Sequence, residues 1–239
     1  MRIGGFQEFS LIEYPGNISA VVFTQGCNFR CPFCYNPDLV LPERFGLAVD
    51  ERDILAFLKR RAGALEGVTI TGGEPFVQED LADFLGKVKD MDYQVKINTN
   101  GSFPEKLKDV IDQGLVDYVA MDVKAPFDKY SALAGVKVDI FQLRRSIDIL
   151  IGSGLDHEFR TTVVKNMLEH SDLEIIAGML KGAAHYRLQP HVFRDKSLDS
   201  ALTGFPAYSD VQLEQFCKVV DAIIASSEGG IQITPLANQ

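Results

Sequence analysis

Residues 24–36, TQGCNFRCPFCYN, decide how this chain is interpreted, because they place Cys27, Cys31 and Cys34 within eight residues. A cubane 4Fe-4S cluster normally takes one cysteine thiolate per iron. Three cysteines therefore hold such a cluster incompletely and leave one iron open to a ligand that is not protein. An open coordination position distinguishes a reactive metal centre from a structural one.

The fourth cysteine, Cys217, lies far from this motif in the sequence. Its neighbouring apolar residues repeat at helical spacing and describe one face of a helix. The face comprises Leu213, Phe216, Cys217, Val220, Ile223 and Ile224. We interpret Cys217 as a core residue, since cysteine commonly behaves as a small buried hydrophobe.

Other uses of cysteine fit this spacing less well. A disulfide framework is typical of small secreted chains, whereas this chain has 239 residues. Structural zinc needs a second ligand cluster, and the four histidines lie more than a hundred residues downstream without regular spacing. An electron-carrying ferredoxin needs a fourth cysteine in register, which the sequence lacks. Zinc and an incidental turn stay open as alternatives to the open-site cluster.

The Cys-x3-Cys-x2-Cys spacing, with aromatic Phe33 directly before Cys34, resembles the signature of the radical S-adenosylmethionine enzymes. The resemblance implies two cofactors, a 4Fe-4S cluster on Cys27, Cys31 and Cys34 and S-adenosylmethionine on the open iron, with Phe33 beside them. It also implies reductive cleavage of S-adenosylmethionine to methionine and a 5'-deoxyadenosyl radical. The cofactors carry this chemistry, and the protein orients them and excludes water.

Composition narrows the class of protein. With 46% hydrophobic residues the chain can bury a large core, so we expect residues 1–239 to form a single domain. The net charge of −9 argues against a nucleic-acid or anionic-membrane surface. The opening MRIGGFQEFSLIEYPG lacks the apolar segment of a signal peptide, and no stretch reaches the length of a membrane span. We expect a cytoplasmic protein in an anaerobic setting, because an open iron would be sensitive to oxygen.

Short β-branched runs alternate with amphipathic helical stretches along the chain. The expected strands are residues 18–24, 68–71, 95–98, 118–122, 157–164 and 185–189. Two of the expected helices are marked by Leu81, Phe84, Leu85 and Val88 and by Phe141, Ile147, Leu150 and Ile151, the second stopping near Gly152 and Gly154. Six βα units predict parallel strands, in a barrel or an open doubly wound sheet. The family resemblance favours an α/β fold with a partial (βα)6 barrel.

Unusual polar motifs fall where these strands end. The cysteines follow the first expected strand, TGGEP the second, NTNG the third and DVKAP the fourth. Arg160 lies on the fifth strand, and residues 189–191 end the sixth. The functional residues of βα barrels cluster at the carboxyl ends of the strands. The sequence therefore predicts that one rim carries the chemistry.

Gly72, Gly73 and Glu74 form the first of these motifs. The glycines allow a close approach of the backbone to a ligand, and the carboxylate of Glu74 suits an ammonium group. By itself the tripeptide is equally a strand-ending turn. Its position one βα unit after the cysteines resembles the GGE motif of the family, which binds the amino group of S-adenosylmethionine.

Asn98 and Thr99 are candidates for ligand contact, whereas a common turn explains Asn100 and Gly101. In the activating enzymes that the chain resembles, this strand end often reads Asp-Thr-Asn-Gly. Asn98 stands in place of that aspartate, which removes a charge.

Asp122 and Lys124 are charged residues at the end of an apolar strand and point to the same side by alternation. Such charges are either paired or hold a ligand. Lys124 could meet the carboxylate of S-adenosylmethionine with Asp122 orienting it, or the two form a structural ion pair. Arg160 matches by position an arginine near the cofactor in activating enzymes. His191 resembles a histidine that approaches the ribose, with an exposed loop histidine as the alternative.

Closer resemblance narrows the function. The opening GGFQEFSLIEYPGNISAVVFTQGCNFRCPFCYNPDLV, together with GLVDYVAMDVKAPFDKY and FRTTVVKN, is similar to the activating proteins of anaerobic ribonucleoside-triphosphate reductase. Such proteins abstract a hydrogen from a glycine of a partner enzyme and leave a glycyl radical. The implied partners are that reductase and an electron donor such as flavodoxin or ferredoxin. The irregular segment 191–209 is expected near the open rim, where Phe193, Leu198, Leu202 and Phe205 could contact the partner.

Two alternatives stay open. A radical S-adenosylmethionine enzyme of this kind could act on a small molecule, as deazapurine-forming relatives do, or activate another glycyl-radical enzyme such as pyruvate formate-lyase. Outside enzymology, the chain could be an iron-sulfur electron-transfer or cluster-carrying protein.

Overall fold

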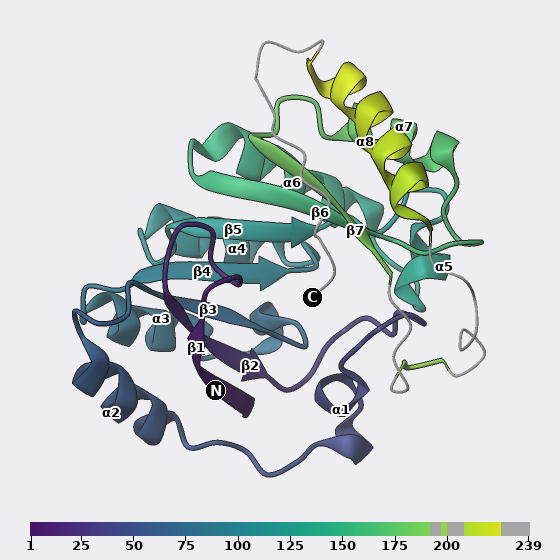
Figure 1. The fold of residues 1–239 in the computed structure, drawn as a ribbon. Coiled ribbons are helices and arrows are strands. Elements are labelled where there is room, and N and C mark those ends of the chain that lie inside the picture. The colour runs from purple at the N-terminus through teal and green to yellow at the C-terminus, as the bar shows by residue number, and fades with distance from the viewer. Residues whose placement is uncertain (192–196, 200–207, 226–239) are drawn as a thin grey trace. The chain divides into compact units, whose positions relative to one another are not determined.

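The computed structural model describes residues 1–191, 197–199 and 208–225 (Figure 1). Its strands are β1 (Ile3–Ser10), β2 (Ser19–Thr24), β3 (Gly67–Gly72), β4 (Gln94–Thr99), β5 (Tyr118–Asp122), β6 (Asp156–Val163) and β7 (His185–Pro190). The helices are α1 (Pro37–Val40), α2 (Glu51–Arg61), α3 (Leu81–Lys89), α4 (Pro104–Asp112), α5 (Tyr130–Ala134), α6 (Ile140–Ser153), α7 (His170–Met179) and α8 (Asp210–Ala225), with single 3-10 turns η1 (Pro42–Arg44) and η2 (Pro75–Val77).

The strands form one seven-stranded sheet in the order in which they occur in the sequence. Strands β2, β3 and β4 are parallel to one another, as are β6 and β7, while β1 runs antiparallel to β2. The order runs from β1 to β7 without closing, so the sheet is open. The six predicted strands correspond to β2–β7, and the expected partial-barrel fold class is confirmed.

Strand β1 was not predicted from the sequence. Its residues, IGGFQEFS, include two adjacent glycines and lack a β-branched run, which weakens the strand pattern. Gln7, Glu8 and Phe9 are exposed, so apolar and polar residues do not alternate cleanly.

Contacts within the chain group into two compact units. Unit 1 comprises Met1–Asn28, Asn36–Thr99 and Phe103–Val119. Its parallel strands are buried on both faces, as is usual where helices follow each strand. The fully buried core residues of these strands include Ala20, Val22, Val68, Ile70, Val95 and Ile97. Helix α3 buries Leu81, Phe84, Leu85 and Val88, the apolar face predicted from the sequence.

Unit 2 comprises Phe29–Tyr35, Asn100–Ser102 and Ala120–Gln239. Helix α6 is capped at its start by Asp139, whose side chain accepts a hydrogen bond from Phe141 N, and at its end by Gly154, which has a φ of 71°. The predicted stop near Gly154 is thus confirmed, because the left-handed conformation there favours glycine. Phe141 is 86% exposed, so our placement of it on the apolar face was wrong.

Helix α8 packs on α7 and on β7 within unit 2. Leu213, Phe216, Cys217 and Val220 are buried, which confirms Cys217 as a core residue. Within residues 1–191, 197–199 and 208–225, none of the helices has the length and hydropathy needed to cross a membrane. That residues 1–239 act as one domain stays a prediction.

Candidate active site

The GGE motif and the start of the cysteine loop meet through their backbones in unit 1. Gly73 N donates a hydrogen bond to Thr24 O at 2.9 Å, and Glu74 N donates to Gly26 O at 2.8 Å. A Cβ atom on Gly73 would lie 2.0 Å from Gly26 O. Gly72 has a φ of 110°, and a Cβ there would lie 2.4 Å from Thr24 N. Both glycines are therefore required for the end of β3 to hold the segment that leads into Cys27.

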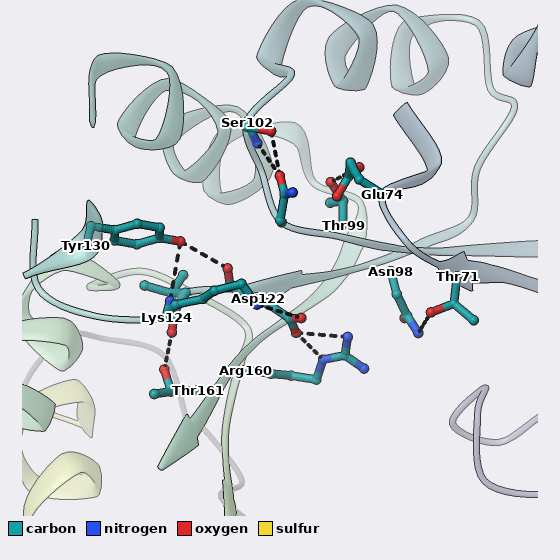
Figure 2. Close-up of polar contacts among 12 residues, drawn as sticks. Thr71, Glu74, Asn98, Thr99, Ser102, Asp122, Lys124, Tyr130, Arg160 and Thr161 are labelled. Atoms are coloured by element: carbon teal, nitrogen blue, oxygen red, sulfur yellow. Dashed lines mark hydrogen bonds and ion pairs between the residues drawn. The ribbon is translucent and has the colours of Figure 1, made fainter. Parts of the chain in front are cut away.

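Glu74 and Thr99 were each predicted from the sequence as ligand-contacting residues, and they contact each other (Figure 2). Thr99 Oγ1 donates to Glu74 Oε1 at 2.8 Å, and Phe76 N donates to the same oxygen at 3.2 Å. The carboxylate is buried, and these bonds offset part of its desolvation cost. The arrangement fixes the Glu74 side chain and caps η2 at the same time.

Asn98 lies beside this pair in unit 1. Its Nδ2 donates to Thr71 Oγ1 at 3.2 Å (Figure 2). Its Oδ1 is buried and accepts no hydrogen bond from the residues that the structure describes. A buried acceptor of this kind suits a ligand that brings a donor.

In unit 2, Asp122 lies between two cations at the end of β5 (Figure 2). Arg160 Nε donates to Asp122 Oδ1 at 2.9 Å, and Lys124 Nζ lies 3.5 Å from Asp122 Oδ2. Desolvation acts to raise the pKa of Asp122, but the charges of Arg160 and Lys124 outweigh it and hold the pKa below its usual value. The carboxylate is therefore ionised at neutral pH and orients both cations.

Lys124 also reaches the cysteine loop of unit 2. Its Nζ lies 5.9 Å from the ring centroid of Phe33, the residue before Cys34. Cys31 is 7% exposed, and burial raises the pKa of its thiol while the charge of Lys124 acts in the opposite direction. Cys34 N donates to Cys31 O at 3.0 Å, which closes a turn between two predicted ligands. A fixed cation thus acts on the Cys31 thiol and lies near the ring of the residue that precedes Cys34.

Tyr130 is a residue that our sequence analysis did not single out. Its hydroxyl donates to Asp122 O and accepts from Lys124 N, each at 3.3 Å (Figure 2). Its ring contacts Phe29 of the cysteine loop edge to face, with centroids 6.4 Å apart. Burial raises the pKa of Tyr130, so the hydroxyl is neutral. Tyr130 therefore ties the end of β5 to the loop that carries Cys31.

The end of α5 strengthens this connection. Arg30 N donates to Ala134 O at 2.8 Å. Gly135 has a φ of 66°, and a Cβ there would lie 2.0 Å from Arg30 O. The loop and α5 are thus in backbone contact.

We expect Tyr130→Phe to loosen the cysteine loop. The variant loses two hydrogen bonds at the end of β5 but keeps the ring, so alkylation of Cys31 in cluster-free protein should become faster. Tyr186→Phe is the matched control, because Tyr186 is equally buried and donates to Thr161 Oγ1 at 2.8 Å, away from the loop. Both variants should lose about 1–3 kcal/mol of stability. Equal alkylation rates by peptide mapping in the two variants would contradict the role of Tyr130.

His191 packs against the aromatic residues of the cysteine loop. Its ring stacks on Tyr35 with centroids 5.0 Å apart and meets Phe33 edge to face at 6.1 Å. The residue is 2% exposed, so the alternative of an exposed loop histidine is wrong. Burial lowers the pKa of His191, which favours the neutral ring. Contact between His191 and a ribose stays a prediction.

Much of segment 191–209, including Phe193, Leu202 and Phe205, lies outside the described residues. Leu198 N donates to Cys34 O at 3.2 Å, and Asp199 N donates to Pro32 O at 3.0 Å. The described part of the segment therefore pairs with the backbone of the cysteine loop.

A model of the Radical SAM superfamily, named for S-adenosylmethionine, matches residues 21–177. The chain belongs to this superfamily. A protein of Methanocaldococcus jannaschii, provisionally named a glycyl-radical enzyme activating enzyme, is 32% identical over 229 residues, covering 93% of this chain and 92% of its own. The pyruvate formate-lyase-activating enzyme of Clostridium pasteurianum is 32% identical over 142 residues, covering 56% and 57% of the two chains.

Solved structures agree on the fold of this radical SAM protein. SuiB of Streptococcus suis bound to S-adenosylmethionine superposes with a TM-score of 0.73 at 14% identity, over 91% of this chain and 50% of SuiB. A domain of the pyruvate-formate lyase-activating enzyme of Bacteroides vulgatus gives a TM-score of 0.55 at 15% identity, over 71% of this chain and 99% of that domain. At this identity the likeness shows the fold alone.

Enzymes of this superfamily use a 4Fe-4S cluster and S-adenosylmethionine, which confirms the two expected cofactors. The donor set fits them. The cysteine thiols form no disulfide among the described residues. In unit 1, Thr99 holds the carboxylate of Glu74, which suits an ammonium group, and in unit 2, Asp122 holds the ammonium of Lys124, which suits a carboxylate. The assignment of these residues to the cofactors stays a prediction.

Proposed function

We propose that this radical SAM protein activates a glycyl-radical enzyme by taking a hydrogen atom from a glycine of that partner. The similarity to the provisionally named M. jannaschii activating enzyme supports this most, because it extends over 93% of the chain. The bound cofactors supply a radical able to abstract hydrogen from an unactivated carbon. The work of the chain is to hold, orient and shield them.

Each set of residues has a defined task in this proposal. Cys27, Cys31 and Cys34 hold the cluster and leave one iron for the second cofactor. Lys124, oriented by Asp122, binds the carboxylate of S-adenosylmethionine, and Glu74, fixed by Thr99, binds its ammonium group. We also propose that six further residues contact the bound S-adenosylmethionine: Phe33, Gly72, Gly73, Asn98, Arg160 and His191.

The partner that we propose is anaerobic ribonucleoside-triphosphate reductase. The opening segment and GLVDYVAMDVKAPFDKY resemble the activating proteins of that reductase, and this resemblance supports the choice of partner. A flavodoxin or ferredoxin in the cytoplasm would supply the electron, because the chain has a single cluster motif and no second carrier motif. A pyruvate formate-lyase is the second candidate partner, favoured by the 32% identity to the Clostridium pasteurianum activating enzyme.

Anaerobic co-incubation distinguishes the partners. The reduced protein with S-adenosylmethionine should generate the doublet EPR signal of a glycyl radical on anaerobic ribonucleotide reductase from the same organism. Reactions without S-adenosylmethionine are the control. A radical on pyruvate formate-lyase alone would reassign the partner. Cleavage of S-adenosylmethionine with no radical on either enzyme would exclude the activase and favour a small-molecule substrate.

A further inference from the structure

Strands β6 and β7 of unit 2 carry polar side chains that the proposed cofactor site does not use. The strands are parallel, with Arg160 opposite Arg187 and Thr162 opposite Gln189. Side chains alternate between the two faces of a strand, so these four share one face. The other face carries Phe159, Thr161, Tyr186 and Leu188, which are all buried. Arg187, Gln189 and Thr162 therefore face the same side as Arg160, which holds Asp122.

These side chains have unused hydrogen-bonding capacity. Arg187 is partly exposed, and its Nη2 lies 3.4 Å from Glu158 Oε2, longer than a normal hydrogen bond. A guanidinium has five N–H donors, so one long contact leaves most of them available. Gln189 and Thr162 make no side-chain hydrogen bond to any residue that the structure describes, and both are partly exposed.

The charge balance favours a neutral ligand for this group. Arg187 already faces the carboxylate of Glu158, which is 1% exposed. Asp122 is similarly matched by Arg160, at 2.9 Å. Lys124 also faces Asp122, at 3.5 Å, and our proposed function assigns it to the cofactor. A second anion beside Arg187 would compete with Glu158, whereas a carbonyl oxygen would not.

The spacing favours an extended peptide. Arg187 and Gln189 are two residues apart on β7, which places them about 6.6 Å apart along the strand. In an extended peptide, the backbone C=O and N–H groups that point to one side recur every two residues, and therefore at the same spacing. A primary amide can donate to a backbone carbonyl and accept from a backbone N–H, and the guanidinium can donate to the next carbonyl.

We propose that Arg187, Gln189 and Thr162 form a subsite for the main chain of the peptide segment that contains the target glycine. This inference rests on the proposed function, because it assumes a protein substrate. Recognition through the main chain needs no particular side chain at the target. It also suits glycine, because a residue without a Cβ lets backbone and subsite approach closely.

Arg187→Lys and Gln189→Leu test the subsite. Lysine keeps a positive charge opposite Glu158 but loses the planar fork of donors. Leucine keeps the approximate size of Gln189, whose side chain makes no hydrogen bond to the described residues. His185→Gln is the control, because His185 is exposed at the start of the same strand.

Two quantities are measured with anaerobic ribonucleotide reductase as the probe. They are KM for glycyl-radical formation, and Kd of the reductase for cluster-free protein by biolayer interferometry. Both should rise roughly tenfold in each variant, as expected for the loss of one hydrogen-bonding group. Cleavage of S-adenosylmethionine without the reductase should be unchanged in both variants, and His185→Gln should match the wild type throughout.

The outcomes separate this inference from the proposed function. Wild-type KM and Kd in both variants would overturn the subsite and leave the activase intact. A parallel loss of uncoupled cleavage would also overturn it, because the residues would then act on the cofactor. A wild-type protein that neither binds nor activates the reductase or pyruvate formate-lyase would overturn both.

Discussion

Cys31→Ala is expected to abolish reconstitution of the 4Fe-4S cluster, whereas Cys217→Ala is expected to leave it intact. Cluster iron binds thiolate sulfur, and two cysteines cannot replace three. The pair is well matched, because Cys31 and Cys217 are each 7% exposed and each lose one sulfur. A difference between them therefore reports ligation and not packing.

Iron and sulfide content and EPR of the reduced protein measure this effect. Cys27→Ala and Cys34→Ala should behave like Cys31→Ala. Cys217→Ala should lower stability by about 1–2 kcal/mol for the lost packing, with full cluster content. A normal cluster in Cys31→Ala would contradict the assignment of Cys31 as a cluster ligand.

Lys124→Met is expected to retain the cluster and to weaken binding of S-adenosylmethionine roughly tenfold to a hundredfold. The substitution keeps the length of the side chain and removes the charge that lies between Asp122 and Phe33. A charge-assisted hydrogen bond contributes about 1.5–3 kcal/mol, which corresponds to that range of affinity.

Lys129→Met is the control for Lys124→Met. Lys129 Nζ pairs with Asp172 at 2.8 Å, so this variant also loses a lysine charge and an ion pair. That ion pair lies at the start of α7, where Asp172 is part of the helix cap. Titration of both cluster-loaded proteins with S-adenosylmethionine gives the comparison. Equal affinities in the two variants would assign Lys124 a structural role.

Much of the fold could be predicted because its patterns are local. Strand β5 has the bounds that its apolar run predicts, and α6 ends directly before Gly154, the glycine that marks the stop. Strand β1 lacked such a pattern, and its pairing with β2 depends on tertiary contacts that periodicity does not encode.

The candidate site could be predicted residue by residue but not as a set of contacts. Glu74 and Thr99 were each nominated as ligand contacts, and their hydrogen bond links residues 25 positions apart. Tyr130 was not predicted, because nothing in the sequence distinguishes a tyrosine at the start of a short helix from an ordinary core residue. Its bridging role depends on the Asp122 carbonyl and the Phe29 ring, which meet it only in the folded chain.

Deuterium transfer from the partner tests the central claim most directly. Anaerobic ribonucleotide reductase is prepared with glycine deuterated at Cα and incubated with the reduced protein and S-adenosylmethionine. Mass spectrometry of the 5'-deoxyadenosine should find one deuterium from the partner, together with a glycyl radical on the reductase. Unlabelled 5'-deoxyadenosine in the presence of the labelled reductase, or none at all, would contradict the account.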